Sequence, residues 1–584
     1  MLGERIEKAD VIVVGSGAAG MMAALRARAA GMTVVLIEKA RQYGGTTATS
    51  GGLFWIPNHG IEGFQDSPGQ AMEYLRNLAQ GTVPEARLRA YVDNAPLMLR
   101  FLQNMGIRCE TLRTSIDYYS ELPGSHVGRL VAVPEFDGSE LGDEFFRMRA
   151  PNPMRVLFNR YLIDRPQSYA LSGQKPGWQW VAANLVLKYW LDFGMRFKSR
   201  RDRRATGGDA LIGLLRRELA RQDIPLILDC GMKELVREEG RVIGLIVEHK
   251  GAQRTIGVSR GVILTAGGFE QNQQLRDVYI SVPTDRRWSA TPEGGNTGDA
   301  LRAAMDIGAA SAALGTMWWM PVLRLPSSVY PNIEIAHAMG FEQRYPNSIM
   351  VNQQGERFCN ENISYDRFGL EMIRDCQRTG ANVPCWMIFD ATYRERYSCG
   401  GLMPSLVMPD RRVPPGWWDN YLYRAGSIGE LADKIAVPRD TLTATVERFN
   451  GFAAQGVDQD FGRGGTAFDQ ARADRRVKPN GCLGALDAGP YYAVRIDLGD
   501  IGSKGGLRCN EHAQVLDSEG QPIAGLYAAG NCAASPFGDT YPGPGGTIGA
   551  ALTFGFVAAE HLSAEEVAKN GDFPASSILT MTVK

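Results

Sequence analysis

The sequence predicts an α/β protein in which one domain is inserted into another. A strand, a glycine-rich turn and a helix lie near the amino terminus, and similar buried strands return only much later, at residues 241–268 and 525–531. Glycine accounts for 68 of 584 residues, about 12% against roughly 7% in average proteins, which indicates many tight turns and close approaches of the backbone to a ligand. The length is about four times the usual domain unit, so at least two domains are expected.

Composition and charge exclude several classes of function. Lysine and arginine number 63 and aspartate and glutamate number 64, so no basic excess indicates a nucleic-acid partner. The nine cysteines contain no CxxC pair and the six histidines no close pair, so we expect neither a disulfide framework nor a metal site. A reducing compartment, the cytoplasm, is the expected location.

The apolar segments predict a soluble protein. The apolar run after the charged amino terminus is too short for a signal peptide or a membrane span. The longest apolar stretch elsewhere, residues 181–197, contains Lys188 and Asp192 and therefore predicts a partly buried helix. Contact with a membrane surface through this helix stays open.

The first 38 residues predict a unit that binds a dinucleotide. A mostly β-branched strand at 10–14 leads through a glycine turn into a helix that ends at Gly31, and a second strand at 33–37 ends in Glu38. The helix amino terminus offers N–H groups to a pyrophosphate, and Glu38 can accept hydrogen bonds from a ribose diol. The turn residues expected at the pyrophosphate are Gly15, Ser16, Gly17, Ala18 and Gly20.

A second glycine-rich loop at 44–52 distinguishes FAD from NAD. An NAD domain has no general need for such a loop, whereas a longer dinucleotide with an isoalloxazine ring does. Small residues let the chain lie beside the pyrophosphate and the flavin, and hydroxyl groups serve as donors. The cofactor-binding residues expected here are Lys39, Gly45, Thr46, Thr47, Ser50, Gly51 and Gly52.

Segments far along the chain fit the same cofactor. Strands running into glycine turns occur at 261–268 and 525–531, and residues 545–549 precede an apolar helix whose free N–H groups could receive the flavin carbonyls. The expected contacts are Ala266, Gly267, Gly530, Asn531, Thr547 and Ile548. We therefore predict a discontinuous Rossmann-like FAD-binding domain, residues 1–316 and 489–584, with an inserted α+β substrate-binding and catalytic domain at 317–488.

Several segments together resemble a known family. They are GGTTATSGGLFWIPN, NTGDALRAAMDIGAA followed by WWMP, NSIMVNQQGERFCNE, GDIGSKGGLRCNEHAQVL, GLYAAGN and DTYPGPGGTIGAALTFG. They look like the 3-ketosteroid Δ1-dehydrogenases, flavoproteins of the fumarate reductase and succinate dehydrogenase superfamily, over residues 10 to about 562. The resemblance implies FAD-dependent α,β-desaturation of a cyclic ketone, most often a 3-ketosteroid.

The resemblance also implies roles for individual residues. Tyr541 of the TYPGPG block and the N–H of Gly545 would hold the substrate ketone, and Tyr365 would abstract the α-proton. A tyrosine of the DYYSELPG segment would support that base, and the register leaves Tyr118 and Tyr119 as alternatives.

The chemistry requires an oxyanion holder, a base and a hydride acceptor. A phenol O–H and a backbone N–H can converge on a developing enolate oxygen. Free tyrosine titrates near pH 10, so we expect a second phenol that donates to Tyr365 to favour its phenolate. The flavin would accept the β-hydride at N5.

Alternative functions remain open. A fumarate reductase-like enzyme would clamp two carboxylates with arginine and histidine, and its covalent members carry a histidine beside the early glycine loop. That histidine is absent here, which predicts non-covalent FAD and an uncharged carbonyl substrate. A smaller cyclic ketone such as a cyclohexanone derivative, or Δ4-desaturation of a 3-ketosteroid, would use the same tyrosines. A flavin-binding sensor or carrier is the non-enzymatic alternative, and a quinone is the expected electron acceptor because no second NAD fingerprint is evident.

Overall fold

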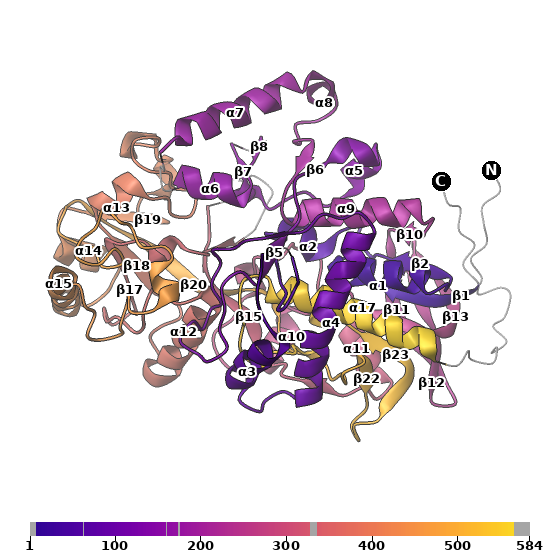
Figure 1. Ribbon diagram of the computed structural model, residues 1–584. Coiled ribbons are helices and arrows are strands. Elements are labelled where there is room, and N and C mark those ends of the chain that lie inside the picture. Colours follow the sequence, from indigo (N-terminus) through magenta and orange to yellow (C-terminus); the bar gives the residue numbers. More distant parts are fainter. Residues whose placement is uncertain (1–7, 62, 159, 173–175, 327–335, 566–584) are drawn as a thin grey trace.

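The structure is a computed structural model that describes residues 8–61, 63–158, 160–172, 176–326 and 336–565. Its larger sheet has eight strands (Figure 1). Five of them run parallel and form the centre of the predicted α/β fold. They are β10 (Leu226–Ile227), β2 (Val34–Ile37), β1 (Lys8–Val14), β13 (Ala252–Leu264) and β23 (Pro522–Ala528).

Burial on both faces explains the continuous apolar sequence of β1. Val11 and Val13 lie in one hydrophobic core, and Ile12 and Val14 lie in another on the opposite face of the sheet. Successive side chains of a strand point to opposite faces, so a strand covered on both sides has no polar position in its middle.

Helices from the two ends of the chain pack together over one face of this sheet. Helix α1 (Ala18–Ala29) follows β1 directly, and α17 (Gly546–Ala564) contacts it along its length. Figure 1 shows the yellow α17 beside the indigo α1, with α4 (Glu85–Asn104) and α9 (Gly208–Arg221) on the same side. The amino-terminal and carboxyl-terminal segments therefore form one layer, as the discontinuous cofactor domain requires.

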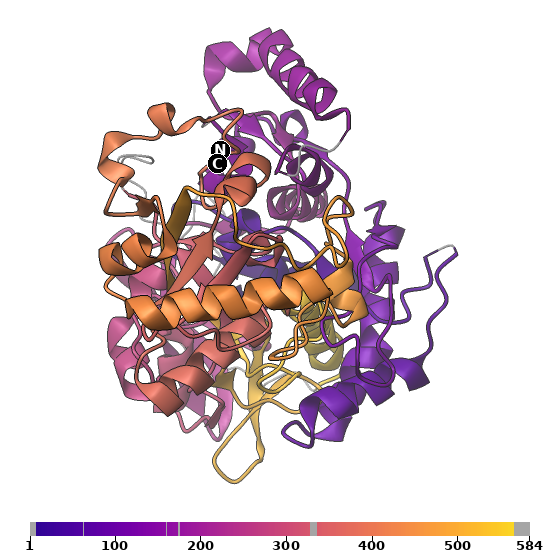
Figure 2. The same ribbon diagram turned by 90° about the vertical axis from the view of Figure 1, so that its left-hand side faces the viewer.

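A second sheet of six strands forms the other half of the molecule. Its strands are β15 (Met317–Leu323), β16 (His337–Ala338), β17 (Ser348–Val351), β18 (Cys385–Phe389), β19 (Leu422–Ala425) and β20 (Tyr491–Ser503). Figure 2 views this half from outside, with the long orange helix α15 (Arg439–Gln455) across it. Strand β20 pairs with β15, β18 and β19, so residues 491–503 are part of this sheet.

Two segments differ from the sequence-based expectation. The strand expected at 261–268 is the end of a longer strand, β13, which begins at Ala252 and forms a hairpin with β12 (Arg241–His249). The apolar stretch 181–197 is two helices, α7 (Trp178–Leu191) and α8 (Phe193–Lys198), whose apolar side chains are largely exposed. Within the described ranges, no helix combines the length and apolar character that crossing a membrane requires.

Candidate active site

One large cavity of about 1390 Å³ brings both groups of predicted site residues together. A single small ligand generally occupies a pocket of about 300–1,000 Å³, so this cavity has room for a dinucleotide and a second molecule. Every residue predicted to contact the cofactor lines it except Gly20. The tyrosines Tyr118, Tyr365 and Tyr541 line it as well, together with Gly545.

The first glycine turn fits a pyrophosphate. Gly15 has φ +105°, and a Cβ there would lie 2.5 Å from the carbonyl oxygen of Thr265 on the neighbouring strand. At Gly20 a Cβ would lie 1.9 Å from the carbonyl oxygen of Gly15, so this glycine permits packing of α1 on the turn and does not reach the cavity. Gly17 is different, because a Cβ there would meet nothing closer than the Thr47 hydroxyl at 3.6 Å and would instead narrow the cavity.

Glu38 fixes the turn from the end of β2. Its Oε2 accepts hydrogen bonds from the Ser16 hydroxyl at 2.7 Å and from the Ser16 N–H at 3.1 Å, while Oε1 accepts from the N–H of Ala40. Glu38 also lines the cavity, where a ribose diol could donate to its remaining lone pairs. Lys39 lines the same wall, but its Nζ is held by Asp299 at 2.9 Å and by Thr297.

The second glycine loop forms a short helix, α2 (Gly45–Thr49), that points its hydroxyl groups at the first turn. The Thr47 hydroxyl accepts a hydrogen bond from the N–H of Ala18, and that of Thr46 accepts from the Asn296 amide at 2.8 Å. The two loops therefore close on one another, as expected for the binding of one dinucleotide by both. The donors and small residues of this cradle fit FAD.

The sequence reasoning missed Asn296, which lines the cavity, and Glu270, which does not line it but holds Asn296. The Asn296 amide bridges Thr46 and the Glu270 carboxylate, and Glu270 also accepts the N–H of Ser503 at 3.1 Å. Burial raises the pKa of Glu270 to about 7, so its charge changes near neutral pH. The NTGDALRAAMDIGAA segment contains Asn296, which a closer inspection of that motif could have assigned.

Three phenols meet at the other end of the cavity, and each comes from a different part of the chain. Tyr118 follows β4 (Glu110–Thr111), Tyr365 begins α12 (Tyr365–Thr379), and Tyr541 precedes α17. Their ring centroids lie 5.4–5.7 Å apart in all three pairs. Edge-to-face contact of this kind brings the three hydroxyl-bearing rings to one point.

The structure distinguishes the two adjacent tyrosines. Tyr118 contacts both other phenols and lines the cavity. Tyr119 does not line the cavity: its ring lies under the Arg367 guanidinium, and its N–H donates to the hydroxyl of Tyr74. Of the two alternatives, only Tyr118 lies with Tyr365 and Tyr541.

A buried ion pair holds the loop that carries Tyr118. The Asp117 carboxylate accepts from the Trp55 indole at 2.7 Å and from Arg129 at 2.8 Å, and the N–H of Tyr118 donates to the carbonyl of Pro542. Burial raises the pKa of Asp117 to about 6 against the opposing effect of Arg129. The Pro542 contact joins this loop directly to the residue that follows Tyr541.

Lys504 connects the other two tyrosines. Its fully buried ammonium group lies 3.1 Å from the Asp366 carboxylate and 2.9 Å from the carbonyl oxygen of Asp539. Asp366 follows Tyr365 in the chain, and Asp539 lies two residues before Tyr541. The lysine of the GDIGSKGGL block, whose role the sequence did not predict, therefore fixes the spacing between two phenols.

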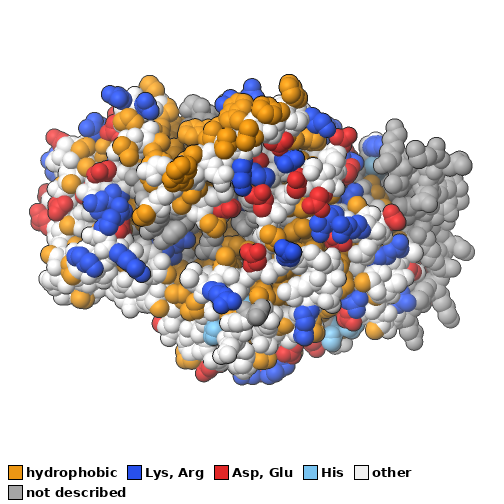
Figure 3. Space-filling view, turned by 45° about the horizontal axis from the view of Figure 1, so that its top comes forward, with side chains coloured by type: hydrophobic (Ala, Val, Ile, Leu, Met, Phe, Trp, Pro, Cys, Tyr) orange, Lys and Arg blue, Asp and Glu red, His pale blue; other side chains and the backbone are white. Residues whose placement is uncertain are grey.

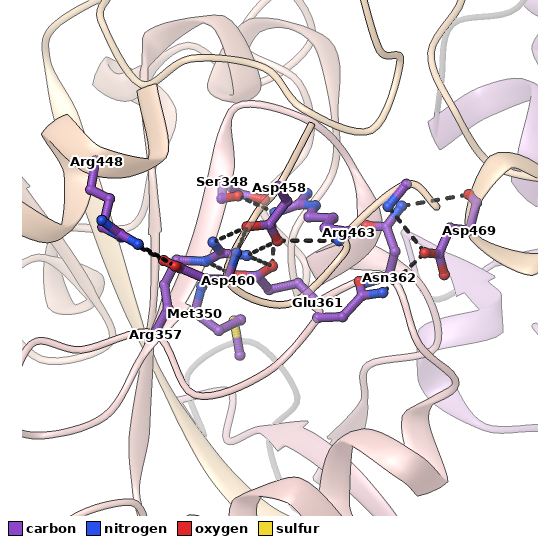
Figure 4. A network of polar contacts seen from close by, with 12 residues as sticks. Ser348, Met350, Arg357, Glu361, Asn362, Arg448, Asp458, Asp460, Arg463 and Asp469 are labelled. Atoms are coloured by element: carbon purple, nitrogen blue, oxygen red, sulfur yellow. Dashed lines mark hydrogen bonds and ion pairs between the residues drawn. The ribbon is translucent and has the colours of Figure 1, made fainter. Parts of the chain in front are cut away.

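A polar network holds the segment before Tyr365 in place (Figure 4). Arg357 pairs with Glu361 at 2.8 Å and with Asp458 at 2.9 Å, all three buried. Arg463 lies 3.3 Å from Glu361, and Asn362 donates to the carbonyl of Asp469. Because several long-range contacts hold residues 357–362, the position of Tyr365 at the start of α12 is fixed relative to the second sheet's half.

The charge environment of Tyr365 differs from the expectation. We expected a second phenol to donate to Tyr365 and favour its phenolate. Instead burial, and then interactions with the hydroxyls of Tyr118 and Tyr541, raise the pKa of Tyr365 well above its usual value near 10. The main physical reason is burial, which disfavours the charged phenolate, and the two neighbouring phenols add to this effect.

Comparisons with known proteins agree with this geometry. The model of a family described as an FAD binding domain matches residues 10–548. A 3-oxosteroid 1-dehydrogenase of Mycolicibacterium smegmatis is 38% identical, with 96% of this chain and 98% of that protein aligned. The chain belongs to the 3-ketosteroid Δ1-dehydrogenase family. Membership of this family confirms the resemblance and makes the protein an FAD-dependent oxidoreductase, so the non-enzymatic alternative is wrong.

Two further comparisons describe the range of the family. The crystal structure of a 3-ketosteroid Δ1-dehydrogenase from Sterolibacterium denitrificans in complex with 1,4-androstadiene-3,17-dione is 40% identical, covers 96% of this chain and 100% of its own, and has a TM-score of 0.91. A 4-oxocyclohexanecarboxylate 2-dehydrogenase of Sinomonas cyclohexanicum is 34% identical, with 98% of this chain and 96% of that protein aligned. The 3-ketosteroid dehydrogenase scaffold thus includes relatives named for a steroid and for a single ring.

Proposed function

We propose that the protein desaturates a cyclic ketone between its α and β carbons, with a 3-ketosteroid as the first candidate and the 1,2 bond as the site of reaction. The observation that carries this proposal is the meeting of three phenols in the cavity that also receives the dinucleotide. FAD, bound non-covalently, would supply the acceptor for the β-hydride.

The three phenols support distinct roles. Tyr541 and the N–H of Gly545 would hold the ketone oxygen, since Gly545 heads α17, where backbone amides have no partner within the helix. Tyr365 would take the α-proton. Tyr118, in edge contact with both rings, would keep the Tyr365 hydroxyl directed at the α-carbon. Loss of one oxyanion donor generally costs about 100- to 1000-fold in rate.

A smaller cyclic ketone is the second candidate, because the relative from Sinomonas cyclohexanicum is named for a cyclohexanone carboxylate. Purified flavoprotein with an artificial electron acceptor would be given 3-ketosteroids and monocyclic ketones, and mass spectrometry and NMR would locate each new double bond. We expect Δ1 products from 3-ketosteroids. A Δ4 product would contradict the assigned position, and turnover of none of these ketones would contradict the desaturase function.

We also propose a domain division and a location that the structure supports. The FAD-binding domain would comprise residues 1–316 and 504–584 and the inserted domain 317–503, with the second boundary moved from 488 to the end of β20 because of its strand pairing. The protein would work in the cytoplasm, since all nine cysteines are described and none is bonded to another.

A quinone is the proposed electron acceptor, and a membrane surface is the proposed place to meet it. Exposed apolar side chains gather on α7 and α8, among them Trp180, Trp190 and Phe197, which are 81%, 48% and 91% exposed. Figure 3 shows this hydrophobic area together with nearby basic side chains. An apolar face flanked by lysine and arginine is typical of a helix that lies in the membrane interface.

Sedimentation with lipid vesicles tests this contact. The Trp190→Ser/Phe197→Ser variant should bind vesicles with a 20% anionic lipid fraction, on the order of the anionic content of a cytoplasmic leaflet, several-fold more weakly than the wild type. A Val278→Ser variant changes an apolar residue that is also exposed, 72%, but lies on a different surface, and it should bind as the wild type does. Equal binding by all three proteins would contradict the proposal.

A further inference from the structure

The cavity wall contains a buried arginine that no acidic side chain pairs with. Arg344 ends a short 3₁₀ helix (Glu342–Arg344) of the second sheet's half, and its side chain lines the cavity while only 4% of the residue is exposed. Its Nη2 donates to the carbonyl oxygen of Phe468, a neutral acceptor. Within the described part of the chain, its Nε has no hydrogen-bond partner, and no carboxylate lies within ion-pair distance of it.

The acids around Arg344 are engaged with other groups. Glu342, two residues earlier, accepts from His337 at 2.6 Å and from the N–H of Phe341. Asp469 accepts from the Asn360 amide and from the N–H of Gly464, both at 3.0 Å. Neither carboxylate is therefore available to compensate the guanidinium fully.

A second arginine lies at this end of the cavity. Arg472 also lines it, with its guanidinium 4.7 Å from the centre of the Phe341 ring. Burial, and then the nearness of Arg472, lower the pKa of Arg344 to about 9, against the opposing effect of Asp469. Arg344 thus stays cationic at neutral pH, although burial of an uncompensated charge is costly.

Arg344 lies a short series of contacts away from the phenols. Its guanidinium is 4.1 Å from the centre of the Phe468 ring, Phe468 is in edge contact with Tyr118 at 5.4 Å, and Tyr118 contacts Tyr541. A ligand whose carbonyl oxygen meets Tyr541 would extend past these apolar rings toward the guanidinium. The cavity therefore presents hydroxyl donors at one end, aromatic rings in the middle and a cation beyond them.

We propose that Arg344 is the anchor of an anion subsite and that the preferred substrate is a cyclic ketone with a carboxylate on the side away from its carbonyl group. This inference rests on the proposed desaturase function and adds the class of substrate. A guanidinium binds a carboxylate through paired N–H donors, and a hydrogen bond to a charged group is stronger than one to a neutral group. The carboxylate would supply the negative partner that the Arg344 guanidinium lacks, and it would orient the ring between the phenols.

The test compares acids with their own methyl esters. Purified holoenzyme would be given 4-oxocyclohexanecarboxylate and its methyl ester, and a 3-ketosteroid with a side-chain carboxylate and its methyl ester. We expect kcat/KM for at least one acid to exceed that of its ester by about 10- to 100-fold, the effect of one charge-assisted hydrogen-bonded contact. The two pairs show whether the carboxylate belongs to a single ring or to a steroid.

Variants of Arg344 connect this preference to the proposed group. Arg344→Gln should lower the acid-to-ester ratio by at least about tenfold, chiefly through KM, and Arg344→Lys should restore part of it because the charge remains. Arg439→Gln is the control, since Arg439 pairs with Asp433 outside the network of Figure 4 and its side chain is 54% exposed. It should leave the ratio as in the wild type. An unchanged ratio in Arg344→Gln, or a wild type that prefers both esters, would overturn the subsite.

A separate binding measurement distinguishes the two proposals. Cyclohexanecarboxylate lacks the ketone, so its effect on the melting temperature of the holoenzyme does not depend on desaturation. If it stabilises the wild type and not Arg344→Gln while no ketone is turned over, the subsite stands and the desaturase function fails. If neutral ketones are desaturated and no acid is preferred or bound, the desaturase function stands and the subsite fails.

Discussion

Tyr365 is the residue on which the proposed chemistry most depends. It lies between two other phenols and is the first residue of α12. Tyr365→Phe should lower kcat by roughly 100- to 10,000-fold, the usual contribution of a general base. The visible spectrum of bound flavin should be unchanged. A variant within tenfold of the wild type would contradict the assignment.

The raised pKa of Tyr365 predicts how the rate depends on pH. Below its pKa, the phenolate fraction of a phenol rises about tenfold for each pH unit. Because the pKa of Tyr365 lies well above 10, kcat/KM should rise from pH 6 to pH 9 without reaching a plateau. The measurement should use buffers of constant ionic strength and a stable neutral ketone, so that the change in kcat/KM reflects groups of the enzyme and not of the substrate. A plateau at or below pH 8 would mean that another group is the base.

Tyr118 and Tyr119 form a matched pair for testing the supporting role. Tyr118→Phe removes a hydroxyl beside Tyr365 and should lower kcat by about 10- to 100-fold, within the range for loss of one hydrogen bond to a reacting group. Tyr119→Phe removes the hydroxyl of a half-buried tyrosine outside the cavity and should retain most of the activity. Steady-state kinetics with one ketone would compare kcat of the two variants. A larger loss of kcat in Tyr119→Phe than in Tyr118→Phe would make Tyr119 the supporting residue.

The two kinds of site residue differ in how well sequence predicts them. The glycines of the cofactor loops follow from a motif whose spacing has a backbone reason, and nearly all of them line the cavity. The choice between Tyr118 and Tyr119 depends on a hydrogen bond to Pro542, more than 400 residues away in the chain, which no local pattern specifies. Arg344 belongs to no motif, and its importance comes from a buried Nε that has no hydrogen-bond partner among the described residues.

At the scale of single elements, the start of α17 depends on one glycine. Gly545 has φ +83°, and a Cβ there would lie 2.4 Å from the carbonyl oxygen of Leu53. Gly240, in the hairpin after β11 (Cys230–Glu238), has φ +82° with nothing within 4 Å. The two positions therefore share the same backbone strain and differ only in crowding.

This pair predicts an order of stabilities. Gly240→Ala should cost about 1–2 kcal/mol from the left-handed backbone alone, whereas Gly545→Ala should cost about 1–3 kcal/mol more from overpacking. The melting temperatures of the two variants, followed by flavin fluorescence, should rank in that order. Gly545→Ala should also release flavin more readily, because α17 begins at the cavity. Equal melting temperatures would show that the chain relaxes around the new methyl group.

Elements were predictable where local patterns determine them. The first strand, the first helix and the second strand were placed correctly because a buried strand and a capped turn each have a local signature. The prediction of a single helix at 181–197 was wrong. The Asp192 side chain accepts the N–H of Met195 and so starts a second helix there. The pairing of β20 with β18 and β19 could not be predicted, because the partners of an antiparallel strand can lie far away in sequence.

For the whole molecule, the mode of cofactor attachment gives a simple test. Among the described cavity residues, Cys230 is the one cysteine and His337 the one histidine, and burial raises the pKa of the Cys230 thiol to about 12, so it stays unreactive. Acid precipitation should therefore leave a colourless pellet and transfer all of the flavin to the supernatant, measured by its absorbance. A yellow pellet would contradict non-covalent binding.

Strand β20 gives the molecule a mechanical property. Its first residues pair with β18 and β19, while its last residue, Ser503, is held by Glu270 at the flavin loops, and Lys504 follows at once with its links to Asp366 and Asp539. A rotation of one half of the protein against the other would tilt β20 and move Tyr365 and Tyr541 apart. Entry of a substrate by such a rotation would therefore be incompatible with the arrangement of the phenols seen here.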